Sequence, residues 1–185
     1  MSASVRRIAV FGPESTGKTT LAEKLAAHFN APLVAEYARE FWDARGGIKA
    51  EDIPAIAREQ WRREDAAVCH LLYDKRPERA RLVICDTEAL TTVLWSDLLY
   101  GTTPEELRRG AEARCRHYDL YLLCDIDLPF APDPQRCFPD PADRMRAMAL
   151  WRGALEQRGL PHVIINGKAA ERERRAIAAV AAVLP

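Results

Sequence analysis

Residues 12–19 read GPESTGKT, and this stretch fits the pattern G-x-x-x-x-G-K-[ST]. It follows a short apolar run at 7–11, which is typical of a buried strand. It leads into residues 18–29, where Leu21, Leu25 and Phe29 recur every four positions, as on one face of a helix. In a glycine-rich turn between a strand and a helix, backbone amides and the helix N-terminus face a bound phosphate. The stretch therefore predicts a site for a nucleoside triphosphate.

Single residues of this loop have expected roles. Lys18 would reach the β- and γ-phosphates of ATP, and the Thr19 hydroxyl would hold Mg²⁺. Asn166 follows the last predicted strand, at a sheet edge that contacts adenine in other folds with such a loop, although Asn166-Gly167 is also a turn signal. The residues expected to bind ATP are Gly12, Glu14, Ser15, Thr16, Gly17, Lys18, Thr19, Thr20 and Asn166.

The rest of the chain alternates short apolar runs with segments of helical periodicity. Strands are expected at 7–11, 32–35, 82–85, 120–124 and 162–165. Helices are expected at 18–29, 53–73, 91–100, 104–116, 144–158 and 169–184, with Thr103 as the N-cap of the helix that begins at Pro104. This alternation predicts an α/β fold with a parallel sheet and helices on both faces. At 185 residues the chain is expected to form one domain, 1–185.

The composition argues against several classes of protein. Basic and acidic residues number 27 each, so no net positive charge favours binding to nucleic acid. No apolar run reaches the ~18 residues of a membrane span, and residues 1–7 are not followed by the apolar segment of a signal peptide. The five cysteines and four histidines have no metal-site or disulfide spacing. We therefore expect a cytoplasmic protein with no membrane or nucleic-acid partner, and the oligomeric state stays open.

Two carboxylates are placed for chemistry. Asp86 closes the apolar run at 82–85 and should lie at the carboxyl edge of the sheet, beside the phosphate loop, where ligands bind in open α/β folds. It could hold Mg²⁺ or accept a proton from a substrate hydroxyl, and the alternative is a helix N-cap. Glu36 follows the second strand and could act as a general base or anchor the acceptor hydroxyl. The alternative for Glu36 is a solvated first turn of a helix.

Residues 125–143 contain five prolines, at 129, 132, 134, 139 and 141, and predict a mobile lid rather than core. Arg136 lies inside this segment and Arg144 beside it, where a closing arginine could neutralise charge during phosphoryl transfer. The aromatic residues expected on or near the cleft are Tyr37, Trp42, Trp95 and Phe130, with packing in the core as the alternative role for each.

Four motifs in order resemble a known family. They are GPESTGKT at 12–19, EYAREF at 36–41, DTE at 86–88 followed by Thr91-Thr92, and PFAPDPQR at 129–136. Together they resemble the ribosylnicotinamide kinase domains of the NadR type and their stand-alone relatives, over most of the chain. The sequence departs from the family at Phe130 and Pro134, where the family has tryptophan and glycine. The DNA-binding and adenylyltransferase activities of the longer family members are not expected of this segment.

The resemblance implies a P-loop, nucleoside/nucleotide-kinase-like sheet with strand order 2-3-1-4-5, and phosphorylation of nicotinamide riboside to nicotinamide mononucleotide by ATP and Mg²⁺, a step of NAD salvage. A kinase for another nucleoside or nucleoside monophosphate, or a nucleotide-dependent ATPase switch, are the alternatives. Glu36 and Glu88 could attract the cationic pyridinium ring, and either Glu36 or Asp86 could be the base. The expected catalytic residues are Lys18, Glu36, Asp86 and Arg136, with Thr19 and Asp86 on the metal. The expected acceptor-binding residues are Glu36, Tyr37, Arg39, Asp86, Glu88, Trp95, Phe130 and Asp133.

Overall fold

The computed structural model describes residues 4–74 and 81–184. Its strands form one parallel sheet in the order β2-β3-β1-β4-β5, which confirms the predicted topology. The strands are β1 (Arg6–Phe11), β2 (Leu33–Val34), β3 (Leu82–Asp86), β4 (Leu120–Cys124) and β5 (His162–Ile165). The helices are α1 (Lys18–His28), α2 (Tyr37–Arg45), α3 (Ile53–Tyr73), α4 (Ala89–Tyr100), α5 (Glu105–Arg114), α6 (Pro141–Glu156) and α7 (Ala169–Ala181), with short 3-10 turns η1 (Ala50–Asp52) and η2 (Cys115–His117).

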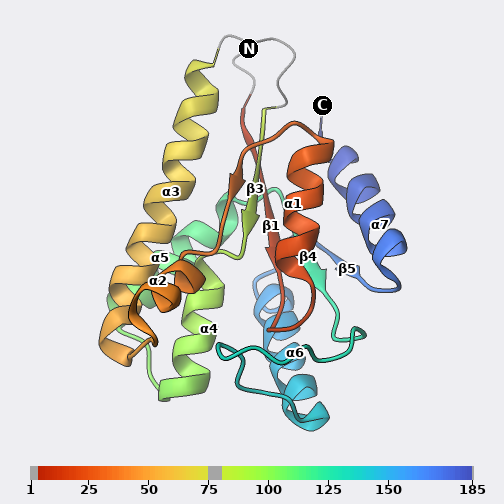
Figure 1. The fold of residues 1–185 in the computed structure, drawn as a ribbon. Coiled ribbons are helices and arrows are strands. Elements are labelled where there is room, and N and C mark those ends of the chain that lie inside the picture. The colour runs from red at the N-terminus through yellow and green to blue at the C-terminus, as the bar shows by residue number, and fades with distance from the viewer. Residues whose placement is uncertain (1–3, 75–80, 185) are drawn as a thin grey trace.

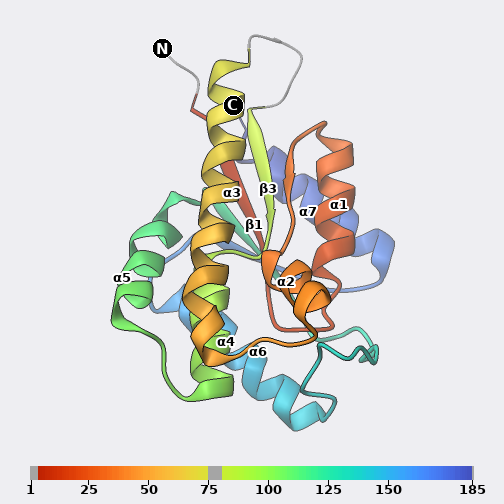
Figure 2. The same ribbon diagram turned by 60° about the vertical axis from the view of Figure 1, so that its left-hand side comes forward.

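Helices cover both faces of this sheet. On one face α1 and α7 lie side by side and pack on the alternate strand residues Ile8, Val10 and Ile84 (Figure 1). On the other face α3, α4, α5 and α6 pack on the strand residues whose side chains point the opposite way, such as Phe11 and Cys85 (Figure 2). Both faces of the central strands are therefore apolar, which explains why β3 and β4 read as unbroken apolar runs.

The register of the central strands positions the phosphate loop. Val10 of β1 lies opposite Asp86 of β3, so the loop that begins at Gly12 leaves the sheet beside the Asp86 carboxylate. Gly12 has φ 143°, and a Cβ there would lie 2.8 Å from the carbonyl oxygen of Cys124 on β4. Only glycine allows the chain to turn this closely against the neighbouring strand. The first residue of the motif is thus required by packing as well as by the phosphate it would face.

Several helix boundaries differ from the sequence prediction, and α2 was not among the expected helices. The α4 helix begins at Ala89 because the Glu88 carboxylate accepts the amide hydrogens of Leu90 and Thr91. The Asp140 carboxylate caps α6 in the same way, so α6 begins at Pro141 and the irregular part of the proline-rich segment ends at 140. The prediction of Thr103 as an N-cap is wrong. Its hydroxyl lies 2.8 Å from the Asp97 carboxylate, and α5 has no side-chain cap.

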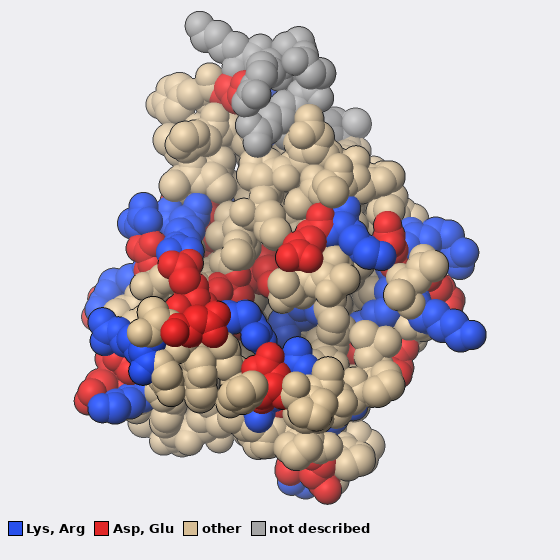
Figure 3. Space-filling model, viewed as in Figure 1, with Lys and Arg blue, Asp and Glu red and all other residues tan. Residues whose placement is uncertain are grey.

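The described residues include free thiols and a surface of mixed charge. No helix among them is long and apolar enough to cross a bilayer. Cys85, Cys115 and Cys124 are buried free thiols, and Cys69 and Cys137 are free and exposed. Lysine and arginine side chains alternate with acidic ones over the face in Figure 3, with no extended region of one sign on it.

Candidate active site

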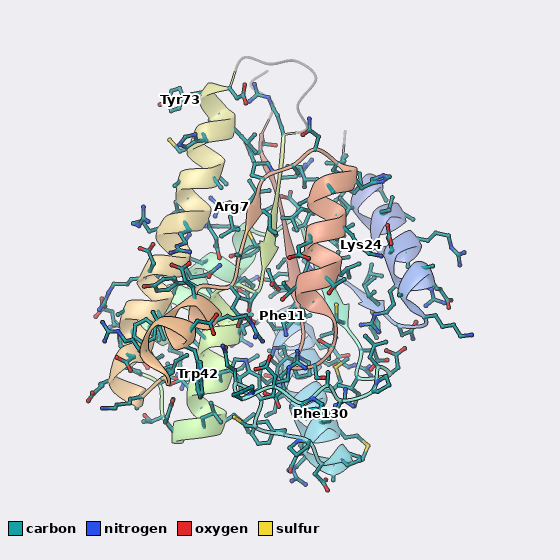
Figure 4. The ribbon with its side chains drawn as sticks, in the orientation of Figure 1. Arg7, Phe11, Lys24, Trp42, Tyr73 and Phe130 are labelled. Atoms are coloured by element: carbon teal, nitrogen blue, oxygen red, sulfur yellow. The ribbon has the colours of Figure 1, made fainter. Side chains whose placement is uncertain are left out.

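A cavity of about 230 Å³ lies at the carboxyl edge of the sheet. Its floor is the phosphate loop, residues 14–20 without a gap, and its walls come from α2, α3, α4 and the proline-rich segment. Figure 4 shows Trp42 of α2 and Phe130 of the proline-rich segment on the same side of the molecule as the end of β1 at Phe11. The other lining residues are Glu36, Ala38, Arg39, Trp42, Ile48, Ile53, Ile56, Gln60, Thr87, Thr91, Thr92, Trp95, Leu99, Tyr100, Gln135, Arg136 and Cys137.

The phosphate loop is held in a tight turn by its own side chains. The Thr16 hydroxyl donates to the Pro13 carbonyl at 2.9 Å, and the Lys18 ammonium donates to the same oxygen at 2.7 Å. Ser15 and Gly17 both have positive φ, 56° and 75°. This backbone turns the amides toward the cavity at the N-terminus of α1, where partial positive charge favours an anion.

Glu36 and Asp86 both lie within the influence of the Lys18 charge. Burial raises the pKa of Asp86 above its ordinary value, while Lys18 and a hydrogen bond from Thr19 oppose that rise. Burial also raises the pKa of Glu36, with Lys18 opposing and the Asp86 charge adding to the rise. Both carboxyls are therefore better proton acceptors than exposed ones, which suits groups that take a proton from a hydroxyl near neutral pH.

The chemistry of the Asp86 carboxylate fits a magnesium ion. Asp86 is 2% exposed, and its Oδ1 atom has no hydrogen-bond partner among residues 4–74 and 81–184. The Thr19 hydroxyl is bonded to the same carboxylate and lies at the start of α1. Oxygen ligands of this kind suit Mg²⁺, which binds through one or two protein oxygens together with phosphates and water. No cluster of three acidic, histidine or cysteine side chains forms a closed metal site in the described chain.

The proline-rich segment, which we call the lid segment (residues 125–140), is bonded to the phosphate loop. The Glu14 carboxylate accepts the amide hydrogens of Cys137 at 2.9 Å and Phe138 at 2.6 Å. The Ser15 hydroxyl accepts the amide hydrogen of Ala131 at 2.9 Å. Arg136 lines the cavity and donates to a carbonyl of its own segment. The segment thus lines the cavity between the phosphate loop and α2, to which Asp133 and Gln135 are bonded.

Several residues predicted in the site do not line the cavity. The prediction that Glu88 faces the acceptor is wrong: it is fully buried, caps α4 and lies near Tyr121. Tyr37 directs its ring toward Arg63, whose guanidinium lies 4.4 Å from the ring centroid. Asp133 pairs with Arg39 at 3.0 Å, Phe130 lies 6.0 Å from the Arg144 guanidinium, and Asn166 accepts from Arg175 of α7. Gly12 and Asp86 are also absent from the lining, although both adjoin the phosphate loop.

Arg172 is one of the residues that support the site and that the sequence did not predict. Arg172 of α7 is 4% exposed, and its guanidinium donates to the Thr16 carbonyl at 2.7 Å and to the Asp127 carboxylate. It ties the phosphate loop to the start of the lid segment. A sequence signal exists, because Arg172 precedes the buried Ala176 and Val180 by one and two turns and so belongs to the buried face of α7.

The comparisons with known proteins agree with this geometry. The family of AAA domains designated AAA_28 matches residues 7–172. The trifunctional NAD biosynthesis/regulator protein NadR of Escherichia coli (strain K12) is 26% identical over 167 residues, which are 88% of this chain and 38% of that protein. This chain therefore spans well under half the length of that relative.

Solved structures of NadR also resemble this chain. NadR structures in complex with NAD and AMP-PNP and in complex with NR match with a TM-score of 0.70 at 26% identity, over 97% of this chain and 49% and 50% of theirs. A thymidylate kinase from Ehrlichia chaffeensis, 14% identical, matches with a TM-score of 0.65 over 97% of this chain and 99% of its own, which indicates a shared fold. The family match includes the phosphate loop, Glu36, Asp86 and the lid segment. The chain therefore belongs to the AAA_28 family of AAA domains.

Proposed function

We propose that this chain transfers the γ-phosphate of ATP to the 5′-hydroxyl of nicotinamide riboside and so forms nicotinamide mononucleotide. The observation that carries the proposal is one cavity lined both by the phosphate loop with Lys18 and by the carboxyl-bearing Glu36, beside the buried Asp86. The likeness to NadR, seen in complex with AMP-PNP and with NR, supports this donor and this acceptor.

The side chains of the cavity suit phosphoryl transfer, which depends mainly on positioning and on neutralising charge. Lys18 and Arg136 supply positive charge on two sides of the cavity, from the loop and from the lid segment. The proton of the acceptor hydroxyl passes to Glu36 or Asp86, the two carboxyls whose pKa is raised. Mg²⁺, when bound by Thr19 and Asp86, would neutralise charge on the phosphate oxygens.

The acceptor end of the cavity favours a cationic nucleoside over a phosphorylated one. Glu36 provides negative charge, and the indoles of Trp42 and Trp95 provide faces that attract a cation by roughly 0.5–2 kcal/mol. Arg39, which could otherwise bind an acceptor phosphate, is already paired with Asp133 at 3.0 Å. A neutralised arginine gives little attraction for a nucleoside monophosphate.

A panel of acceptors tests the proposal. The protein is incubated with ATP, Mg²⁺ and each of nicotinamide riboside, adenosine, uridine, thymidine and a set of nucleoside monophosphates, and the products are identified by mass. We expect nicotinamide riboside to give the highest kcat/KM. A higher kcat/KM for a canonical nucleoside or a monophosphate would overturn this acceptor, and ATP hydrolysis indifferent to every acceptor would favour a nucleotide switch.

The Lys18→Ala variant is the control for a contaminating kinase. Loss of one preorganised positive charge lowers a rate by roughly 10²–10³-fold. Activity on the panel should fall by this factor while the melting temperature stays near that of the parent. An unchanged rate would assign the activity to another protein.

A further inference from the structure

Two buried hydroxyls on the wall of the cavity have no partner. Thr87 is 4% exposed and Thr91 is 2% exposed, and both line the cavity. Neither Oγ1 atom has a hydrogen-bond partner in the part of the chain that the structure describes. A buried hydroxyl without a partner is costly, and in folded proteins such groups are rare. Two of them among the lining residues of one cavity indicate that their partner is a ligand.

The backbone around these hydroxyls is fixed by other groups. The amide of Thr87 donates to the Val10 carbonyl of β1 at 3.0 Å, and the amide of Thr91 is held by the capping Glu88. In a helix, a threonine hydroxyl commonly bonds to a carbonyl three or four residues earlier. Thr91 does not, although it lies in the first turn of α4. The main chains are thus held in place while the hydroxyls stay available.

Thr87 also has an unusual backbone. Its φ is 73°, in the left-handed region that a β-branched residue rarely adopts. Glycine or asparagine would occupy this conformation more readily. A strained residue of this kind is kept where the surrounding structure and the function of the site require it. Here the turn at Thr87 directs Asp86 and Glu88 to different surroundings and leaves the Thr87 side chain on the cavity wall.

The residues of α4 that line the cavity change in character along the helix. Asp86 lies next to the phosphate loop, and Thr87 and Thr91 come next. Trp95 and Leu99 follow at intervals of four residues on the same face. Four residues of a helix span about 6 Å along its axis, so Thr91 and Trp95 would face neighbouring parts of one bound ligand. The order along the wall is therefore hydroxyls, aromatic ring and aliphatic side chain, and the Asp86 carboxylate precedes the hydroxyls in the chain.

We propose that the Thr87 and Thr91 hydroxyls bind the sugar hydroxyls of the acceptor, so that the acceptor lies lengthwise along α4, with its reacting hydroxyl at Asp86 and its base toward Trp95. This inference rests on the proposed function and adds the orientation of the acceptor to it. It implies selection for a ribonucleoside over the corresponding deoxynucleosides, because a buried polar group left unpaired by a deoxy analogue weakens binding of that analogue.

The test uses isosteric variants. Thr87→Val and Thr91→Val keep the shape and branching of the side chain and remove the hydroxyl, whereas Thr87→Ser and Thr91→Ser keep the hydroxyl. We expect each valine variant to raise KM for nicotinamide riboside roughly tenfold, the worth of one buried hydrogen bond, with KM for ATP unchanged. Each serine variant should keep most of the parent affinity.

Deoxy analogues identify the group that the hydroxyls contact. KM is measured for the 2′-deoxy and 3′-deoxy forms of nicotinamide riboside. For the analogue that lacks the contacted hydroxyl, the KM of a valine variant should lie within twofold of the KM of the parent. If a valine substitution raised KM by the same factor for the ribonucleoside and for both analogues, the proposed sugar contact would be overturned. KM values within twofold of the parent for both valine variants would overturn it as well.

Thr103→Val is the matched control. Thr103 is also buried, but its hydroxyl is bonded to Asp97 and it does not line the cavity. This variant should melt at a lower temperature and keep the parent KM. Thr87→Val and Thr91→Val should melt at or above the parent temperature, because their hydroxyls lack protein partners. If the parent phosphorylates nicotinamide riboside and the valine variants behave as the parent does, only this inference fails. If the parent phosphorylates no nucleoside, both this inference and the proposed function fail.

Discussion

Asp86 and Glu88 lie two residues apart, at the end of β3 and just before α4, and both are buried. The Glu88 carboxylate accepts two backbone amide hydrogens and lies near the Tyr121 hydroxyl, so its oxygens are used within the fold. Asp86 keeps one oxygen without a partner among the described residues and lies beside Thr19 of the phosphate loop. A buried carboxyl group therefore has a structural role at Glu88 and is available to a ligand at Asp86. The two positions differ in their hydrogen-bond partners rather than in their burial.

Replacing Asp86 should have the largest effect. We expect Asp86→Asn to lower kcat by roughly 10²–10³-fold, because the amide can neither hold a cation as well nor accept a proton. The same change should leave stability at pH 7 equal or higher, because burial raises the pKa of this carboxyl and so disfavours its charged form. Steady-state rates and urea unfolding measure the two effects. A destabilised variant with near-parent kcat would make Asp86 structural, like Glu88.

Arg172 and Arg136 also differ in this way: one has a structural role and the other lines the cavity. Arg172 is 4% exposed and bonded to Asp127 and to the phosphate loop, whereas Arg136 lines the cavity. Arg172→Met should destabilise the protein by about 1–3 kcal/mol, because it leaves the buried Thr16 carbonyl without its donor. Arg136→Met is the matched control, and it should lower kcat more than it weakens ATP binding while the melting temperature changes little. Urea unfolding and steady-state kinetics compare the two variants, and the reverse pattern would exchange the two roles.

Glu88→Gln should change how stability depends on pH. Burial raises the pKa of Glu88 to about 8 in the folded protein, against 4.5 as its ordinary value. Between these values the folded state holds the proton more tightly than the unfolded state does, so stability is full below about pH 4.5 and falls as pH rises toward 8. The parent should therefore lose about 1 kcal/mol per pH unit that Glu88→Gln does not lose. Urea unfolding at pH 5, 6.5 and 8 measures this difference, and identical slopes would contradict a protonated Glu88.

The smallest expected effect is at the lid segment. Glu14→Gln weakens a charged acceptor of the amides of Cys137 and Phe138, and a bond to a charged group is stronger than a neutral one. The lid segment should open more often, so that limited proteolysis within 125–140 speeds up roughly fivefold. A non-hydrolysable ATP analogue with nicotinamide riboside should slow the cleavage in the parent. Cleavage that ignores both the variant and the ligands would mean that the segment is not a lid.

The sequence predicted the elements of the fold well because apolar runs and helical spacing report burial directly. It also placed Asp86 correctly at the sheet edge beside the phosphate loop, because the end of an apolar strand is visible in the sequence. It could not place Glu88, because the direction of that side chain depends on the backbone turn at Thr87. The positive φ of Thr87 cannot be predicted from the residue pattern. The pairings of Arg39 with Asp133 and of Arg63 with the Tyr37 ring were also beyond it, since they join helices to segments distant in the sequence.

The register between β1 and β3 also fixes the position of the Asp86 carboxylate relative to the phosphate loop. Asp86 reaches the phosphate loop because it lies opposite Val10, two residues before Gly12. A slip of one residue would move the carboxylate by about 3.3 Å and turn it from the face of α1 and α7, on which Leu82 and Ile84 lie, to the face covered by α3, α4, α5 and α6. Single-residue insertions in β3 should therefore end activity even where the chain still folds, whereas insertions at the exposed turn around Gly101 leave this alignment intact.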